Sequence, residues 1–293
     1  MRENEPSSTA LTVAMGMLFN ARRADRHGLV SEEDAAAYRC FLEACGGGRR
    51  RLRTLGNPIA PWFVRAAEAM LLPGISLHYG LRKRFIGDQV VAALEAGAQQ
   101  VVNLGAGFDA LALRLHRQYP DVRFIEIDHP ATQAVKRNAI GALDAHSNLQ
   151  LLPVDFTRQT LQERLGSFDA FEPDRRTVYV LEGVAMYLTE EEVLSLLADL
   201  RALSGTPTLV FSFLEPQGSP DQNVGPLLSL YLRTQGEGLA WRIQRTQLRD
   251  FLDGGAYGLD HVATGHDLRQ AYAPPSYRGP IHHGELLAVA KAR

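Results

Sequence analysis

The sequence has few cysteines, little net charge and no long apolar run. Its 293 residues include two cysteines, Cys40 and Cys45, which are too few for a disulfide framework, so we expect a reducing, cytoplasmic setting. The 31 basic and 33 acidic residues nearly cancel, which gives no overall reason to expect a nucleic-acid partner. The apolar stretch 10–19 is broken by Thr12 and Gly16. It is too short to span a bilayer, so we expect no membrane partner.

Strand-like and helix-like segments alternate along most of the chain. Hydrophobic residues make up 45% of it, enough for a large core. Strand-like runs occur at 101–104, 123–127, 149–154, 177–181, 208–214 and 286–290, with 261–264 as a weaker candidate. Helix-length segments lie between most of them, at 130–142, 159–165, 190–203 and 246–252. This alternation predicts an α/β fold with a largely parallel sheet whose faces are covered by helices.

The two ends of the chain differ from this pattern. Residues 1–80 look helical and include a helix start at Ser31, whose hydroxyl can cap the helix, while the three acids that follow suit the positive end of the helix dipole. We therefore expect an N-terminal helical extension over 1–80 and a main domain over 81–293. The last two strand-like runs have a loop rich in Pro, Tyr and His between them and predict an antiparallel edge. A segment that begins rich in Gly and Pro predicts an inserted cap at about 215–245.

A glycine turn follows the first apolar run directly. Gly105, Ala106 and Gly107 come after VVNL and before a helix-like segment. Glycine permits a tight turn and a close backbone approach to a ligand at a helix N-terminus. The turn therefore indicates a nucleotide-binding site, although turns of this kind also occur for structural reasons.

Acidic residues follow the next three strand-like runs. Asp128 ends FIEID, 23 residues after Gly105, while Asp155 follows LQLLPV and Glu182 follows TVYVL. A carboxylate at the first of these places can accept both ribose hydroxyls of a nucleoside, or can cap the Pro-initiated helix behind it. Ligands of open α/β sheets bind at the carboxyl ends of the strands. The glycine turn and these three acids each follow one of four successive strand-like runs, which predicts that the ligand binds at this edge of the sheet.

A nicotinamide dinucleotide is the alternative ligand for such an edge. Its fingerprint continues with a glycine three residues after Gly107, where this chain has Ala110, which the relaxed pattern tolerates. Asp109, however, would face a pyrophosphate with like charge. An NAD-dependent oxidoreductase is therefore the second interpretation, and a binding or scaffold protein on the same fold is the third.

Several ordered blocks resemble the leucine carboxyl methyltransferase-like family, which includes bacterial O-methyltransferases of polyketide and other secondary metabolism. The blocks are NLGAGFDALALRL, FIEIDHP with Lys136 shortly after it, PVDF and LEGVAMYLTEEE, spread over roughly residues 81–203. The resemblance implies S-adenosyl-L-methionine as cofactor. It also implies a class I methyltransferase (Rossmann-like) sheet of seven strands, mostly parallel with the last strand antiparallel.

The resemblance also implies roles for single residues. Arg82 matches an arginine that holds the carboxylate of the cofactor, and Arg84 is a second possible match. Glu182 matches a glutamate beneath the methionine amino group, and Asp128 matches the ribose-binding acid. The remaining implied contacts are the turn Gly105, Ala106 and Gly107 under the methionine part, and Asp155 and Phe156 at the adenine.

The methyl acceptor is less well defined by the sequence. We expect a small molecule methylated on a hydroxyl or carboxyl oxygen; a protein carboxyl terminus is the acceptor of the other branch of the family. A hydroxyl needs a base, for which Tyr187, His282 and His283 are candidates, although a structural role is the simpler interpretation of each. Adjacent histidines do not easily share one ion, so we expect no metal. The aromatic residues Trp241, Tyr231, Tyr272 and Tyr277 suggest an aromatic or polar acceptor.

Overall fold

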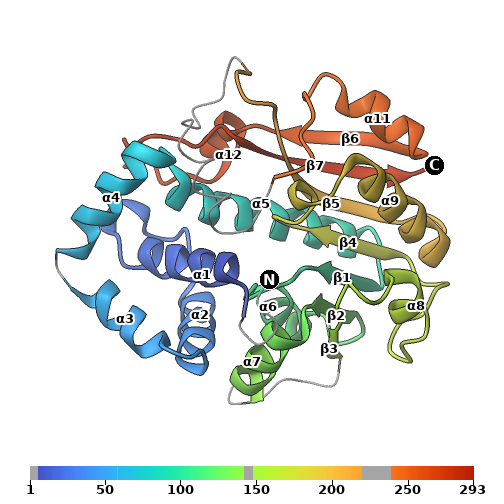
Figure 1. Ribbon diagram of the computed structural model, residues 1–293, viewed down its shortest axis with the longest axis horizontal. Coiled ribbons are helices and arrows are strands. Elements are labelled where there is room, and N and C mark those ends of the chain that lie inside the picture. Colours follow the sequence, from blue (N-terminus) through green and yellow to red (C-terminus); the bar gives the residue numbers. More distant parts are fainter. Residues whose placement is uncertain (1–5, 58, 142–147, 220–238) are drawn as a thin grey trace.

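A seven-stranded sheet forms the centre of the protein (Figure 1). The computed structural model describes residues 6–57, 59–141, 148–219 and 239–293. The strands are β1 (Gln100–Leu104), β2 (Arg123–Asp128), β3 (Leu149–Pro153), β4 (Thr177–Leu181), β5 (Thr208–Leu214), β6 (Tyr257–Ala263) and β7 (Glu285–Ala292). Their order is β3-β2-β1-β4-β5-β7-β6. β1 to β5 pair in parallel, while β7 is antiparallel to both β5 and β6. The prediction of a mostly parallel sheet with an antiparallel last strand is confirmed.

Helices cover both faces of the sheet. On one face pack α5 (Ile75–Glu95), α6 (Leu111–Gln118), α7 (Pro130–Gly141) and α12 (Gly265–Tyr272), and on the other α8 (Leu161–Gly166), α9 (Glu190–Ser204) and α11 (Leu248–Gly254). Successive strand residues point to opposite faces. Val101 accordingly belongs to the first core and Val102 to the second. The central strands β1 and β4 are buried along their whole length.

The N-terminal helices gather on one side of the sheet, at the left in Figure 1. They are α1 (Ser8–Ala21), the short 3-10 helix η1 (Ala24–Arg26), α2 (Glu32–Ala44), α3 (Gly48–Gly56) and α4 (Ala60–Leu71). Ser31 caps α2 as expected, because its hydroxyl accepts a hydrogen bond from the backbone N–H of Asp34 at 3.0 Å. The boundary proposed at residue 80 lies inside α5, which begins at Ile75 after a left-handed turn at Gly74.

The last third of the chain differs in detail from the sequence-based expectation. The weaker strand candidate is part of β6, and α12 lies between β6 and β7, where no helix was expected. A capping box at its N-terminus explains this helix: the Thr264 hydroxyl accepts from the N–H of Asp267, whose carboxylate accepts from the N–H of Thr264. The central part of the proposed cap, 220–238, lies outside the described residues.

Candidate cofactor and active site

The carboxyl ends of four parallel strands bring the predicted site residues to one edge of the sheet. Leu104 of β1 pairs with Ile127 of β2 and with Leu181 of β4, so the residues that follow these strands meet. Asp128 pairs with Pro153 at the end of β3, two residues before Asp155. The structure therefore places the glycine turn, Asp128, Asp155 and Glu182 along the same edge, as the spacing predicted.

The glycine turn is tight and is covered by protein. Gly105 and Gly107 have φ values of 66° and 50°, in the left-handed region that favours glycine. A Cβ at position 105 would lie 2.3 Å from the side chain of Val184, and one at position 107 would lie 3.1 Å from Ala10 of α1. Only glycine fits at position 105 without a shift. The N-terminal end of α1 thus lies over the turn.

Asp128 fastens this turn to the end of β2. Its two carboxylate oxygens accept hydrogen bonds from the backbone N–H groups of Gly107 and His129, each at 2.7 Å. Burial raises the pKa of Asp128, and these N–H groups only partly counter that effect. The side chain is half-buried, so a carboxylate with two fixed donors stays accessible to a ligand at the edge.

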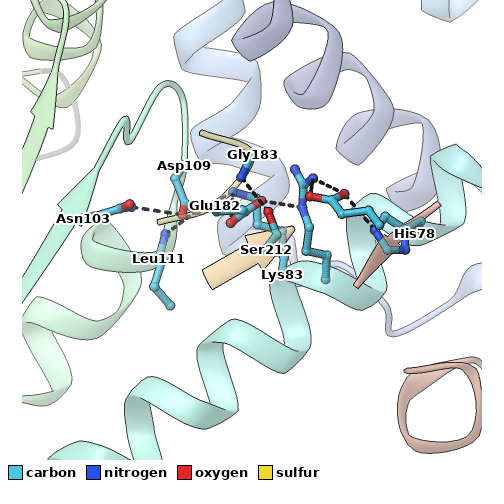
Figure 2. A network of polar contacts seen from close by, with 10 residues as sticks. His78, Lys83, Asn103, Asp109, Leu111, Glu182, Gly183 and Ser212 are labelled. Carbon is cyan, nitrogen blue, oxygen red and sulfur yellow. Dashed lines mark hydrogen bonds and ion pairs between the residues drawn. The ribbon is translucent and has the colours of Figure 1, made fainter. Parts of the chain in front are cut away.

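Three charged side chains beyond the turn form a compact ion-pair cluster (Figure 2). Arg82 and Lys83 are neighbours on α5, and both reach Glu182. The Arg82 Nε lies 2.7 Å from Glu182 Oε1, and the Lys83 Nζ lies 3.0 Å from Glu182 Oε2. Lys83 also lies 3.1 Å from the Asp109 carboxylate. Arg84, the second possible match, is exposed, so the structure places Arg82 at the edge instead.

Asp109 belongs to this cluster, although the sequence indicated only that its charge would oppose a pyrophosphate. Its carboxylate accepts hydrogen bonds from the Leu111 N–H at 3.0 Å and from the Asn103 side chain at 3.2 Å. Burial opposes its ionisation, but Lys83 and Lys136 outweigh burial and lower the pKa of Asp109. The residue therefore both accepts from the first N–H of α6 and carries a negative charge at this edge. The sequence placed this charge near the turn, where it served only as an argument against a dinucleotide, because a contact with Lys83 cannot be seen in the local pattern.

Glu285, which sequence reasoning missed, joins the cluster from β7. Because β7 runs antiparallel to β5, its first residue pairs with Leu214, the last residue of β5. The start of β7 thus lies at the edge where the parallel strands end. Glu285 accepts hydrogen bonds from Arg82 Nη1 at 2.6 and 2.8 Å, and its carboxylate lies 2.9 Å from His78 Nε2.

A second buried ion pair supports the turn from below. The Lys136 Nζ lies 2.6 Å from the Glu126 carboxylate and donates to the backbone carbonyl of Asp109 at 2.7 Å. It also lies 5.4 Å from the centre of the Phe41 ring on α2. Lys136 and Glu126 are fully buried. This lysine joins α7, β2, α2 and the segment after the glycine turn.

Asp155 and Phe156 lie at the far end of the edge, at the exit of β3. The Asp155 carboxylate accepts from the hydroxyl and the N–H of Thr157 at 2.6 and 3.0 Å. These two bonds lower the pKa of Asp155. The Phe156 side chain is 52% exposed. An exposed aromatic ring beside a carboxylate is suited to stacking on a planar base.

The candidate bases lie in different surroundings. Tyr187 ends η2 (Ala185–Tyr187) and is half-buried. His282 is buried with its ring 5.1 Å from that of His78, and burial lowers its pKa to about 3. His283 packs against His266 of α12, with ring centres 4.6 Å apart. His282 therefore stays uncharged within the protein and is a weak base.

The residues proposed to contact an acceptor are mostly structural in the described part. Trp241 is buried against Phe251 at 5.2 Å between ring centres, and its backbone N–H bonds to the carbonyl of Met186 in η2. The hydroxyl of Tyr277 donates to the carbonyl of Pro280 at 2.9 Å. Tyr231 lies outside the described residues.

The polar groups of the edge fit the methionine part of S-adenosylmethionine. Arg82 Nε and Glu182 Oε1 are buried and close together, yet neither makes a well-directed hydrogen bond within the described residues. An α-amino acid group brings an acceptor for the first atom and a donor for the second. Among the described residues, no three His, Cys, Asp or Glu side chains are grouped to hold a metal ion. None of the described helices is long and apolar enough to cross a bilayer.

A family model and several relatives match the sequence of this chain. The family model described as leucine carboxyl methyltransferase matches residues 10–201. A relative from Parafrankia sp. is 32% identical over 54% of this chain and 56% of its own length, and one from Bacillus subtilis is 36% identical over 36% and 34%. A relative from Mycolicibacterium paratuberculosis is 28% identical over 77% and 72%. All three carry the provisional name S-adenosyl-L-methionine-dependent methyltransferase.

These matches are partial in length. The chain spans about half of the Parafrankia relative and a third of the Bacillus relative. Among solved structures, the magnesium protoporphyrin IX methyltransferase of Synechocystis PCC 6803 with bound S-adenosylhomocysteine is similar at 15% identity. It has a TM-score of 0.48 and covers 80% of this chain and 95% of that one.

Proposed function

The chain belongs to the leucine carboxyl methyltransferase family, and from this premise we propose that it is an S-adenosylmethionine-dependent methyltransferase. The observation that carries the proposal is the cluster of Arg82, Lys83 and Glu182 beside the glycine turn and Asp128. A nicotinamide dinucleotide has no amino acid group for this cluster to bind. The cluster therefore favours S-adenosylmethionine over NAD.

We propose a specific division of roles along the edge. Asp128 accepts the ribose hydroxyls, since its carboxylate is already oriented by two backbone N–H groups. Asp155 and Phe156 bind the adenine, and Arg82 and Glu182 bind the carboxylate and the ammonium group of the methionine part. Gly105, Ala106 and Gly107 let the backbone approach the ligand closely.

The cofactor supplies a methyl group on a sulfonium sulfur, which an acceptor oxygen displaces in line. Charge is neutralised in this step, so orientation and exclusion of water are the main demands on the protein. The buried cluster and α1, which covers the turn, meet both demands. The chain's own residues hold the two ends of the ligand, while the acceptor approaches from the opposite side of the sulfur.

We propose a hydroxyl or carboxyl oxygen of a small molecule as the acceptor. His282 does not serve as the base near neutral pH, since its pKa is lowered to about 3. A carboxylate acceptor needs no base, so none of the described residues has to remove a proton from it. Tyr187 in η2 is proposed to line the acceptor site, because η2 directly follows the turn after Glu182.

Calorimetry of the purified protein tests the cofactor. We expect S-adenosylhomocysteine to bind and NAD not to bind. Asp128→Asn should weaken S-adenosylhomocysteine roughly 100-fold, since two hydrogen bonds to a charged group are lost or reversed. Asp253→Asn, which alters a surface ion pair with Arg293, is the matched control and should leave the affinity unchanged.

A panel of acceptors with radiolabelled S-adenosylmethionine tests the reaction. The panel contains phenols, aliphatic alcohols, small carboxylic acids and peptides with free carboxyl termini. Transfer to one of the small molecules would support the proposal. Binding of NAD in place of S-adenosylhomocysteine, or transfer to the peptides alone, would contradict it.

A further inference from the structure

Arg82 is held by carboxylates from two different strands. Glu182 follows β4 and lies at the Nε side of the guanidinium, while Glu285 begins β7 and accepts two bonds from Nη1. Both carboxylates are buried, with side-chain exposures of 6% and 4%. A ligand that draws Glu182 away would leave Glu285 as the partner of Arg82, so the arginine would keep a counter-charge.

Glu285 is itself fixed from several directions. His78 lies four residues before Arg82 on α5, one helical turn away, and its Nε2 is 2.9 Å from Glu285. The Ser212 hydroxyl of β5 also bonds to Glu285 and accepts from the N–H of Gly183 at 2.8 Å. Burial opposes ionisation, but Arg82 and His78 outweigh it and keep the pKa of Glu285 below its usual range. Figure 2 shows this chain of contacts from His78 to Gly183.

The two glutamates contact Arg82 through different atoms of its guanidinium. Within the described residues, the ion pairs and hydrogen bonds of its guanidinium use Nε and Nη1. Both Nη1 and Nη2 lie beside Gly183, where an added Cβ would be 3.9 and 4.0 Å from them. Gly183 directly follows Glu182 at the edge of the sheet. The Nη1 and Nη2 end of the guanidinium thus lies beside the place where β4 ends.

We propose that Glu285 is a positioning residue, which orients the guanidinium of Arg82 to receive the carboxylate of the cofactor's methionine part and leaves Glu182 for the ammonium group. This inference rests on the proposed function. Glu285 touches no ligand in this role and acts through Arg82. A preset guanidinium needs no reorganisation on binding, which raises affinity for a ligand that has the carboxylate.

Two ligands separate positioning from general structural support. S-adenosylhomocysteine contains the amino acid group, whereas 5′-methylthioadenosine has the same nucleoside and sulfur without it. In Glu285→Gln we expect about a tenfold or greater loss of affinity for S-adenosylhomocysteine by calorimetry. Binding of 5′-methylthioadenosine should stay within about twofold of the wild type. Retained binding of the second ligand also shows that the variant is folded.

A double variant tests whether Glu285 acts through Arg82. Arg82→Lys keeps the charge but removes the planar fork that Glu285 orients. If the inference is correct, adding Glu285→Gln to Arg82→Lys causes little further loss of S-adenosylhomocysteine affinity, because the two residues form one unit. The matched control is Glu172→Gln, a carboxylate that also contacts two arginines, Arg123 and Arg175, but lies before β4 at the other end of the sheet. It should change neither affinity.

The binding results distinguish a positioning role of Glu285 from general structural support. Equal losses for both ligands in Glu285→Gln, or fully additive losses in the double variant, would overturn the positioning role. The proposed function would be untouched by that result, since wild-type binding of S-adenosylhomocysteine stands on its own. Failure of the wild type to bind either ligand would overturn both the proposed function and this inference.

Discussion

At the scale of single residues, two buried carboxylates of the site respond to burial in opposite ways. Burial raises the pKa of Asp128, whose partners are backbone N–H groups. Glu285 is more deeply buried than Asp128, yet its pKa is lowered, because a guanidinium contacts it directly. The difference is that a full positive charge offsets desolvation where dipoles do not. Only Glu285 should therefore stabilise the fold by being ionised.

We expect this difference to appear in the pH dependence of stability. The folded pKa of Glu285 lies below the reference value of 4.5, so the stabilisation is fully present above about pH 4.5 and is lost as the pH falls toward the folded pKa. Glutamine does not titrate. The gap in unfolding free energy between wild type and Glu285→Gln should therefore shrink as the pH falls from about 4.5 to about 3. Urea denaturation at a series of pH values measures it. A gap that stays constant or widens on acidification would contradict the assignment.

The roles of single residues were only partly predictable from the sequence. Asp128 and Glu182 could be placed because each directly follows a strand-like run, and parallel strands end at the same edge. Lys83 could not be placed from the sequence, because its contacts with Glu182 and Asp109 span 99 and 26 positions of the chain. No local pattern records such a contact.

At the scale of elements, α7 depends on one buried lysine. Lys136 is the only positive charge that the structure places against Glu126 among the described residues, and it also bonds to the Asp109 carbonyl after the glycine turn. Burial raises the pKa of Glu126 despite this partner. The pair therefore fixes the position of α7 against β2 more than it adds stability.

Removal of this lysine should be costly. Lys136→Met leaves Glu126 buried without its cation and should lower the unfolding free energy by about 3–5 kcal/mol in urea denaturation. Replacing both residues, as Lys136→Met with Glu126→Gln, should recover part of that loss, since no unpaired charge remains. A double variant less stable than Lys136→Met would show that the pair is not the unit proposed.

The elements themselves were largely predictable, and the exceptions have physical causes. Strands β1 to β5 follow from apolar runs of the right length. The helix α12 was missed because it is only eight residues long and lies in a segment read as a loop. Its Thr264 capping box was the available signal. The proposed cap remains a prediction at 220–238, which the structure does not describe.

At the scale of the whole molecule, the N-terminal helices are joined to the last loop through Arg26. Its guanidinium donates to Asn20 of α1 at 2.5 Å and to Ser76 of α5 at 2.7 Å. It also lies between the rings of Phe19 and Tyr277, 5.5 and 5.3 Å from their centres. Three distant parts of the chain therefore meet on one buried side chain.

We expect Arg26→Met to weaken this junction. The loss of two charge-assisted hydrogen bonds and two ring contacts should cost about 3 kcal/mol in unfolding free energy. Hydrogen exchange should rise in α1 and in residues 274–282 together. Arg23→Met is the matched control, because Arg23 also lies over the Phe19 ring but is more exposed and paired with Asp25. It should cost less than about 1 kcal/mol. Faster exchange in α1 alone would show that Arg26 does not couple the two regions.

The position of β7 also bears on how the protein is made. β7 follows every other strand in the chain, yet it lies between β5 and β6 rather than at an edge. During synthesis β5 and β6 leave the ribosome before β7. Because β7 lies between them in the sheet, neither can make its pairing with β7 until that strand is made. Glu285 is the first residue of β7. In a nascent chain that stops before β7, Arg82 therefore lacks one of its two counter-charges. The ion-pair cluster is therefore complete only once β7 has been made, and a nascent chain that stops before β7 exposes a strand edge on both β5 and β6 to chaperones and proteases.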